Sequence, residues 1–157
     1  GFPGMPLAIK YPNLKITMID SLRKRIDFIN DEIEKLGLEN CRALHARAED
    51  LAREEQFREK YDIGVSRAVA NLSTLSEYVL PFIHIGGHFY AYKSGDIEGE
   101  SKCAENALSK LGGGLINTTY FQLSDSMGER AILDIKKLST TPDTYPRRAG
   151  IPSKKPL

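Results

Sequence analysis

Residues that build disulfide frameworks or metal sites are scarce in this sequence. It holds no tryptophan, two cysteines and three histidines among 157 residues. Cys41 and Cys103 lie far apart in no recognisable spacing, so we expect reduced, buried, small apolar side chains rather than ligands or redox partners. His84 and His88 are four residues apart, but two glycines between them argue against a pair of ligands on one helix. The sequence therefore predicts no metal site.

Long apolar runs are also lacking. No stretch approaches the roughly 20 apolar residues that a transmembrane helix needs, and no signal peptide opens the sequence. Hydrophobic residues make up 41% of the chain and charged residues 27%, a balance typical of one globular domain with a core of its own. We expect a cytoplasmic protein that has no membrane partner.

Charge of both signs is present, but it is unevenly distributed. From residue 136 onward six basic residues face one acid, a net charge of +5 that leaves −4 for residues 1–135. We therefore divide the chain into a domain at 1–137 and a basic C-terminal tail at 138–157. A basic tail on a mildly acidic body indicates a polyanionic partner. The alternative is a solvated, disordered C-terminus, and charge alone does not decide between the two.

Short apolar runs alternate with longer amphipathic stretches along the chain. Lys15–Asp20 is partly β-branched and predicts a buried strand that ends in an acid. We expect Ser21 to be the N-cap of the next helix, whose apolar face repeats every three or four residues until Gly37 ends it. The same signals predict strands at 42–45, 61–66 and 88–93, helices at 6–11, 48–60, 72–83 and 98–111, and a turn at 86–87.

This alternation predicts an α/β fold with a doubly wound, mostly parallel, twisted sheet. The end of the chain differs, because two β-rich runs at 118–123 and 130–135 are separated only by a turn at 124–129 and must pair antiparallel. A parallel sheet that ends in an antiparallel hairpin is the Rossmann-like arrangement of class I AdoMet methyltransferases. Domains that bind only dinucleotides usually lack it.

The first residues, Gly1-Phe2-Pro3-Gly4, look like the end of a cofactor-binding loop, yet no strand precedes them. In such folds this loop joins the first, central strand to the first helix. We therefore expect the first strand to be missing, which leaves the edges of its two neighbours exposed. Self-association through those edges is one expected consequence.

Asp20 is the strongest candidate for a ligand-binding residue. It stands at the carboxyl end of a strand, where open α/β sheets bind ligands, and a carboxylate there can accept both hydroxyls of an adenosine ribose. The alternative is that Asp20 caps the following helix. We favour the ligand role because Ser21 is available as the cap. The pattern specifies adenosine rather than one particular cofactor.

Two further strand ends carry candidate residues. The backbone at Ala48-Glu49 follows a strand and is placed to contact an adenine ring, with the Glu49 or Asp50 side chain in solvent. The alternative is an acidic helix N-terminus that suits the helix dipole. Arg67 ends an apolar strand and is suited to pair with a ligand carboxylate or an RNA phosphate, the alternative being a surface ion pair.

Several motifs, taken in order, resemble one family. They are GFPGMPLAI at 1–9, Asp20-Ser21, RAED at 47–50, SRAVA at 66–70 and YPRRAGIPSKKPL at 145–157. Together they are similar to the bacterial small-subunit rRNA guanine-N7 methyltransferases known as RsmG or GidB. The resemblance runs from the first residue to the last, and the closing string is its most distinctive part.

This resemblance implies S-adenosyl-L-methionine as methyl donor and a guanine of 16S rRNA, free or in the small ribosomal subunit, as acceptor. It places Gly1 and Phe2 in the cofactor loop, Asp20 and Ser21 at the ribose, Ala48 and Glu49 at the adenine, and Arg67 beside the cofactor. The sequence departs from the family at its start, because the acid and further glycines that open the family's loop, and the helical segment before them, are absent.

Guanine N7 carries no proton, so methyl transfer to it requires no general base, and we name no catalytic residue. For the RNA phosphates the candidates are Arg147, Arg148, Lys154 and Lys155, with Lys93 as a weaker one. Three alternatives stay open from the residues alone. They are an AdoMet-dependent methyltransferase of a protein or small molecule, a nicotinamide oxidoreductase, and a non-catalytic RNA-binding module.

Overall fold

The structure is a computed structural model of the whole chain, and it describes residues 1–67, 70–122 and 128–157. The chain forms two compact units, Gly1–Ala48 and Glu49–Leu157. Residues 138–157 belong to the second unit, so the boundary between the units does not coincide with the expected division at residue 137. Within the described residues no helix is long and apolar enough to cross a membrane.

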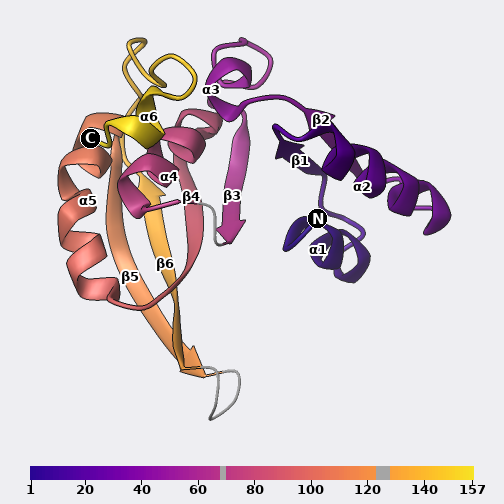
Figure 1. Cartoon of the computed structure of the whole chain (residues 1–157), viewed down its shortest axis with the longest axis horizontal. Helices are drawn as coiled ribbons and strands as arrows, with labels where there is room; N and C mark the ends of the chain where they lie inside the picture. The colour runs from indigo at the N-terminus through magenta and orange to yellow at the C-terminus, as the bar shows by residue number, and fades with distance from the viewer. Residues whose placement is uncertain (68–69, 123–127) are drawn as a thin grey trace. The chain divides into compact units, whose positions relative to one another are not determined.

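The first unit consists of two helices and two parallel strands (Figure 1). In chain order they are α1 (Gly4–Lys10), β1 (Ile16–Asp20), α2 (Arg23–Lys35) and β2 (Cys41–His45). β1 and β2 pair in parallel register, with Asp20 opposite His45. The two carboxyl ends therefore lie side by side at one edge of this pair.

Apolar spacing explains how α2 packs in this unit. Ile26 and Ile29 are buried and contact Ala43 of β2, and Met5, Met18 and Ile33 pack around them. α1 approaches β1 so closely that a Cβ at Gly4 would lie 2.6 Å from Cγ of Met18. Gly37 ends α2 in a left-handed conformation, and the amide of Leu38 bonds the carbonyl of Ile33, as predicted for a glycine C-cap.

The second unit holds a mixed sheet. α3 (Ala48–Leu51) begins at the boundary. The elements that follow are, in chain order, β3 (Tyr61–Arg67), α4 (Leu72–Val79), the 3-10 turn η1 (Leu80–Phe82), β4 (Ile83–Ser94), α5 (Ile97–Leu111), β5 (Gly113–Gln122), β6 (Glu129–Lys137) and α6 (Ile151–Lys154). The strand order is β3-β4-β6-β5. β3 and β4 are parallel, and β6 is antiparallel to both β4 and β5. The predicted parallel pairing and terminal antiparallel hairpin are both confirmed.

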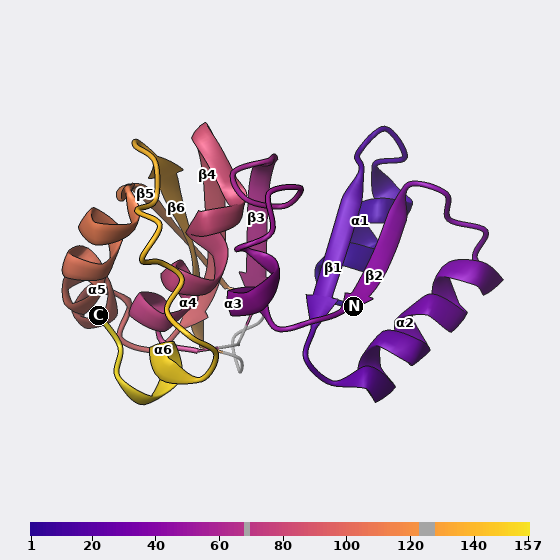
Figure 2. The ribbon, with the colours of Figure 1, turned by 90° about the horizontal axis from the view of Figure 1, so that it is seen from above.

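α4, α5 and the C-terminal segment lie on one side of this sheet, as Figure 2 shows. The core lies under them. Alternate residues of β4 and β6 are buried there, among them Phe89, Leu133 and Ile135. They pack against the apolar faces of α4 and α5, which include Leu72 and Leu111.

Gly86 and Gly87 lie inside β4, so the predicted turn at these residues is wrong. The pairing of β3 with β4 shifts register here, since Tyr61 faces Ile83 whereas Ile63 faces His88. Gly86 has a φ of +91°, and a Cβ at Gly87 would lie 2.5 Å from the carbonyl oxygen of Asp62. The two glycines therefore form a bulge that keeps the strand continuous.

Other local predictions also need correction. Cys103 is exposed and Cys41 is half-buried, so the expected burial of both cysteines is wrong. The helix expected over 48–60 is confined to α3. The expected N-cap Ser21 makes no capping bond, because α2 begins one residue later with Leu22 at the N-cap position. Most of the turn expected at 124–129, and residues 68–69 of the SRAVA motif, lie outside the described residues.

Candidate functional site

Asp20 stands at the carboxyl end of β1, as the sequence predicts. Its Oδ1 accepts a hydrogen bond from the amide of Leu22 at 2.8 Å, and its Oδ2 accepts one from Nη1 of Arg25 at 3.1 Å. The side chain is 25% exposed. A carboxylate has about four lone-pair sites, so these two bonds leave room for further donors. Asp20 therefore holds the turn that precedes α2, does not cap the helix, whose N-cap is Leu22, and still keeps acceptor capacity.

A histidine beside Asp20 holds the loop that leaves β1. Nε2 of His45 lies 3.0 Å from the carbonyl oxygen of Ser21, and Nδ1 lies 3.2 Å from Nη2 of Arg23. Because arginine only donates, Nδ1 must accept, which places the proton of a neutral ring on Nε2. His45 thereby fixes the Ser21 carbonyl at the edge where Asp20 lies, and sequence analysis did not single it out.

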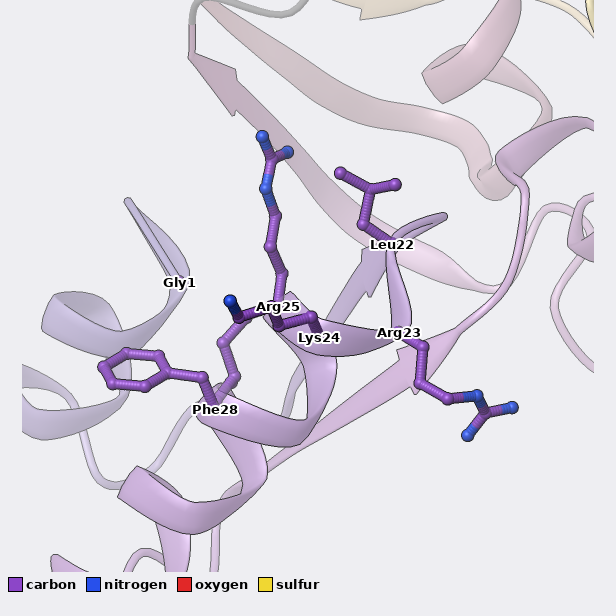
Figure 3. Close-up of a pocket in the computed structure, with 7 residues that line it drawn as sticks. Gly1, Leu22, Arg23, Lys24, Arg25 and Phe28 are labelled. Carbon is purple, nitrogen blue, oxygen red and sulfur yellow. The ribbon is translucent and has the colours of Figure 1, made fainter.

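A hollow of about 610 Å³ lies beside this edge in the first unit. Its lining combines Gly1 with the start of α2, namely Leu22, Arg23, Lys24, Arg25, Phe28 and Ile29 (Figure 3). Gly1 is held there, because its carbonyl oxygen accepts from the amide of Met5 at 2.7 Å. The side chain of Phe2 is 68% exposed. The loop expected to bind a cofactor thus borders an open hollow.

Glu49 differs from the sequence expectation, which placed its side chain or that of Asp50 in solvent. Glu49 is 5% exposed, and its Oε1 accepts a hydrogen bond from the amide of Gly150 at 2.9 Å. The carboxylate therefore fastens the C-terminal segment to α3. Ala48 opens α3, so its backbone remains the part of this motif that is suited to contact a ligand.

Arg67 ends β3, and Lys93 is the second-last residue of β4, its parallel neighbour in the second unit. Arg67 is exposed and pairs in register with Tyr92, the residue before Lys93. Nζ of Lys93 bonds the carbonyl oxygen of Ala70 at 2.7 Å and lies 2.6 Å from Oε1 of Glu100. With its side chain only 11% exposed, Lys93 braces the segment before α4.

Arg147 likewise forms an ion pair with a residue of the second unit. Its Nη2 lies 2.7 Å from Oε2 of Glu77, and its Nε lies 3.0 Å and 3.1 Å from the two carboxylate oxygens. Glu77 is fully buried on α4, and the hydrogen bonds that Arg147 donates to its carboxylate raise the pKa of Arg147. The sequence carried a signal for this partner, since Glu77 is the one charged residue of α4.

A second network fastens the segment just after β6. Lys137 is fully buried, and its Nζ bonds the carbonyl oxygen of Leu80 at 2.7 Å and Oγ1 of Thr141 at 2.6 Å. Glu59 lies 3.1 Å from the same Nζ, but burial outweighs it and lowers the pKa of Lys137. Arg58 adds bonds to the carbonyl oxygens of Thr141 and Tyr145, at 2.7 Å and 3.0 Å. The tail is therefore packed onto the unit.

Three of the predicted RNA-binding residues are exposed. Arg148 lies between the anchored Arg147 and Gly150, while Lys154 and Lys155 lie at the end of α6. The packing of their neighbours holds all three at the surface of the second unit. Within residues 1–67, 70–122 and 128–157 no cluster of three potential metal ligands occurs.

Comparison with known proteins gives consistent matches. The GidB family, described as rRNA small subunit methyltransferase G, matches residues 1–132. A protein of Brevibacillus brevis named ribosomal RNA small subunit methyltransferase G is 49% identical over all 157 residues, and one of Lachnoclostridium phytofermentans with the same name is 50% identical. The chain spans 66% and 65% of the length of these two relatives.

Solved structures share the fold at low sequence identity. TYW2 of M. jannaschii, solved in complex with AdoMet, gives a TM-score of 0.67 at 16% identity, covering 88% of this chain and 65% of that one. A mutant of the 16S rRNA (adenine(1408)-N(1))-methyltransferase of Catenulisporales acidiphilia gives a TM-score of 0.70 at 10% identity, covering 87% and 79%. These likenesses agree with the predicted class I arrangement.

Proposed function

We propose a function from one premise: this chain belongs to the family described as rRNA small subunit methyltransferase G. The function is transfer of a methyl group from S-adenosyl-L-methionine to N7 of a guanine in 16S ribosomal RNA. The observation that carries the proposal is the family match over residues 1–132, together with 49% identity to a named relative along the whole chain.

Asp20 fits the ribose of this cofactor. It stands at the carboxyl end of a strand, is partly exposed, and has two acceptor sites beyond those used by Leu22 and Arg25. We assign Asp20 and Ser21 to the ribose. The remaining cofactor contacts are assigned to Gly1 and Phe2 in the loop, to the backbone of Ala48 and Glu49 for the adenine, and to Arg67 for the carboxylate.

Methyl transfer to guanine N7 requires no proton transfer by the protein. When bound, S-adenosyl-L-methionine supplies an electrophilic methyl group. Guanine N7 is an unprotonated acceptor, so no side chain has to remove a proton. The residues of this chain would act by holding the acceptor near and in line with the methyl group, and by stabilising the shift of positive charge onto the base. We assign no catalytic residue.

The exposed tail residues Arg148, Lys154 and Lys155 are the ones that we assign to RNA phosphates. Arg147 and Lys93 share that assignment from sequence, but their cationic groups are paired with Glu77 and Glu100. We therefore give those two a supporting role, in which they hold the tail and the segment before α4 in place.

Ribosomal RNA as substrate implies a protein of the cytoplasm, and we propose that location. The partner is 16S rRNA or the small ribosomal subunit. Self-association is a further proposal, since β1 and β3 each pair with a single strand among the described residues. Static light scattering over a tenfold range of protein concentration tests it.

Methyl transfer from labelled S-adenosyl-L-methionine to deproteinised 16S rRNA, to small subunits and to a protein extract tests the activity. Label is expected at guanine N7 of RNA. Label confined to protein would favour an AdoMet-dependent protein methyltransferase, and absence of label with retained RNA binding would favour a non-catalytic RNA-binding module. Stabilisation by NADH in place of S-adenosylhomocysteine would favour an oxidoreductase.

The Asp20→Asn substitution tests the cofactor assignment. Hydrogen bonds to a charged group contribute about 1.5–3 kcal/mol, so the affinity for S-adenosylhomocysteine should fall roughly 10- to 100-fold. The readout is the rise in Tm with ligand concentration. Asp27→Asn on the exposed face of α2 removes the same charge and serves as the control. Equal effects of the two substitutions would contradict the assignment.

A further inference from the structure

The charges on α2 are arranged against the helix dipole. Arg23, Lys24 and Arg25 occupy its first turn, which contains no acid. The four acids of α2 all lie further along the helix, at 27, 31, 32 and 34. Cations at the positive N-terminal end destabilise a helix by a few tenths of a kcal/mol to about 1 kcal/mol each. Local rules that a sequence breaks in this way tend to mark functional surfaces.

Apolar side chains are exposed beside these cations. Phe28 is 63% exposed and Leu22 is 52% exposed. On a helix, residues three and four apart are neighbours, so Lys24 and Arg25 lie one turn before Phe28. All of these residues line the hollow of about 610 Å³. In Figure 3 the side chain of Arg23 points away from Phe28, toward the other side of the helix.

We propose that this α2 patch, defined as Leu22, Arg23, Lys24, Arg25 and Phe28, binds single-stranded RNA. Lys24 and Arg25 contact phosphates, and an unstacked base lies on the ring of Phe28. The inference deepens the proposed function, because it names where the RNA substrate is held, and it rests on that function. It adds a surface in the first unit to the tail residues of the second.

The combination of groups favours RNA over other polyanions. Phosphate contacts need only cations, whereas an exposed aromatic ring on the same helix end as the cations offers a stacking platform for a base. An acidic protein segment has no flat π face to place on Phe28. The existing contact of Arg25 with Asp20 is an exposed ion pair, worth at most about 1 kcal/mol, so a phosphate can exchange for it.

Binding of a fluorescein-labelled 12-nucleotide oligouridylate to the full chain, without cofactor, tests the proposal by fluorescence anisotropy between 50 and 200 mM KCl. For single strands each phosphate contact contributes about 0.7 to the slope of log K against log salt. The Lys24→Gln/Arg25→Gln variant should therefore show a slope shallower by about 1.4. The control, Lys10→Gln/Lys15→Gln, makes the same charge change at two exposed lysines of the same unit.

Phe28→Leu keeps apolar surface but removes the ring. Stacking of one base is worth about 1–3 kcal/mol, so the affinity should fall about 5-fold or more with an unchanged salt slope. Equal losses in the two double variants would overturn the proposal, as would an unchanged affinity in Phe28→Leu. Tight binding of polyglutamate of the same charge would indicate an acidic protein partner and would also overturn it.

The two proposals fail separately. Absence of methyl transfer, with RNA binding that depends on the α2 patch, would remove the proposed activity alone. Methylation of 16S rRNA by Lys24→Gln/Arg25→Gln with an unchanged KM for RNA would remove the patch alone. Far-UV circular dichroism and Tm of each variant confirm that α2 is still folded.

Discussion

At the residue scale, the same side-chain type has opposite roles in this chain according to its partner. Arg147 and Arg148 are adjacent in the sequence and identical in charge. Arg147 pairs with the buried Glu77, whereas Arg148 is exposed. A basic residue in a basic tail is therefore no guide to RNA contact until the acids that face it are known.

The pairing of Arg147 leads to a prediction about stability. Arg147→Ala leaves Glu77 buried without its partner, so the free energy of unfolding should fall by about 3 kcal/mol. Adding Glu77→Leu to that variant removes the stranded carboxylate and should recover much of the loss. Urea unfolding measures both.

Arg148→Ala is the matched control at the neighbouring position, with an expected change within about 0.5 kcal/mol. It should instead weaken RNA binding and reduce its salt dependence. A large loss of stability in Arg148→Ala, or none in Arg147→Ala, would contradict this division of roles.

At the scale of elements, β4 shows how a local signal misleads. Two adjacent glycines after an apolar helix are typical of a turn, and the sequence suggested one. The strand instead begins at Ile83 and continues through both glycines as a bulge beside β3. Parallel pairing with Tyr61–Arg67 supplies the backbone partners that keep Ile83–Ser94 extended, and those partners lie outside any local window.

The two glycines of the bulge are needed for different reasons, which a pair of substitutions separates. Gly86 has a φ of +91°, and a Cβ added there would meet no atom within 4 Å. A Cβ added at Gly87 would instead lie 2.5 Å from the carbonyl oxygen of Asp62. Alanine at either position should destabilise the protein by about 1–3 kcal/mol. Asparagine tolerates positive φ, so Gly86→Asn should lose less than Gly86→Ala.

The same asparagine at position 87 should give no relief, because its Cβ meets the same carbonyl oxygen. Chemical denaturation of the four variants gives the comparison. If asparagine is less destabilising than alanine at both positions, or at neither, the assignment of a positive φ requirement to Gly86 and of a steric requirement to Gly87 is wrong.

At the scale of the whole molecule, the two units have cores of very different size. Among the residues that the structure describes, one core cluster of the second unit has thirteen buried residues, whereas a cluster of the first unit has three. The sequence predicted one globular domain, because 157 residues with 41% hydrophobic and 27% charged residues suit a single core. The unequal distribution of burial arises only when the elements are packed.

Hydrogen exchange should reveal that inequality. Local opening free energy increases with buried apolar contact, so amides of β4 and β6 should be the most protected in the chain. Amides of β1 and β2 should exchange at least tenfold faster. Exchange followed by mass spectrometry at peptide resolution measures this, and equal protection of the two sheets would contradict it.

The sequence by itself determined the order of the elements, the parallel pairing, the closing hairpin and the family. Each depends on local periodicity, glycine chemistry or a contiguous motif, and strand-end acids such as Asp20 can be found in the same way. Only the tertiary structure decided which charged side chains are exposed and which are paired with a buried partner. Glu77 and Arg147 are 70 residues apart, and Glu49 and Gly150 are 101 apart. Because Glu77 and Glu49 are buried by parts of the chain distant in sequence, no local pattern reveals that they pair with Arg147 and with the amide of Gly150.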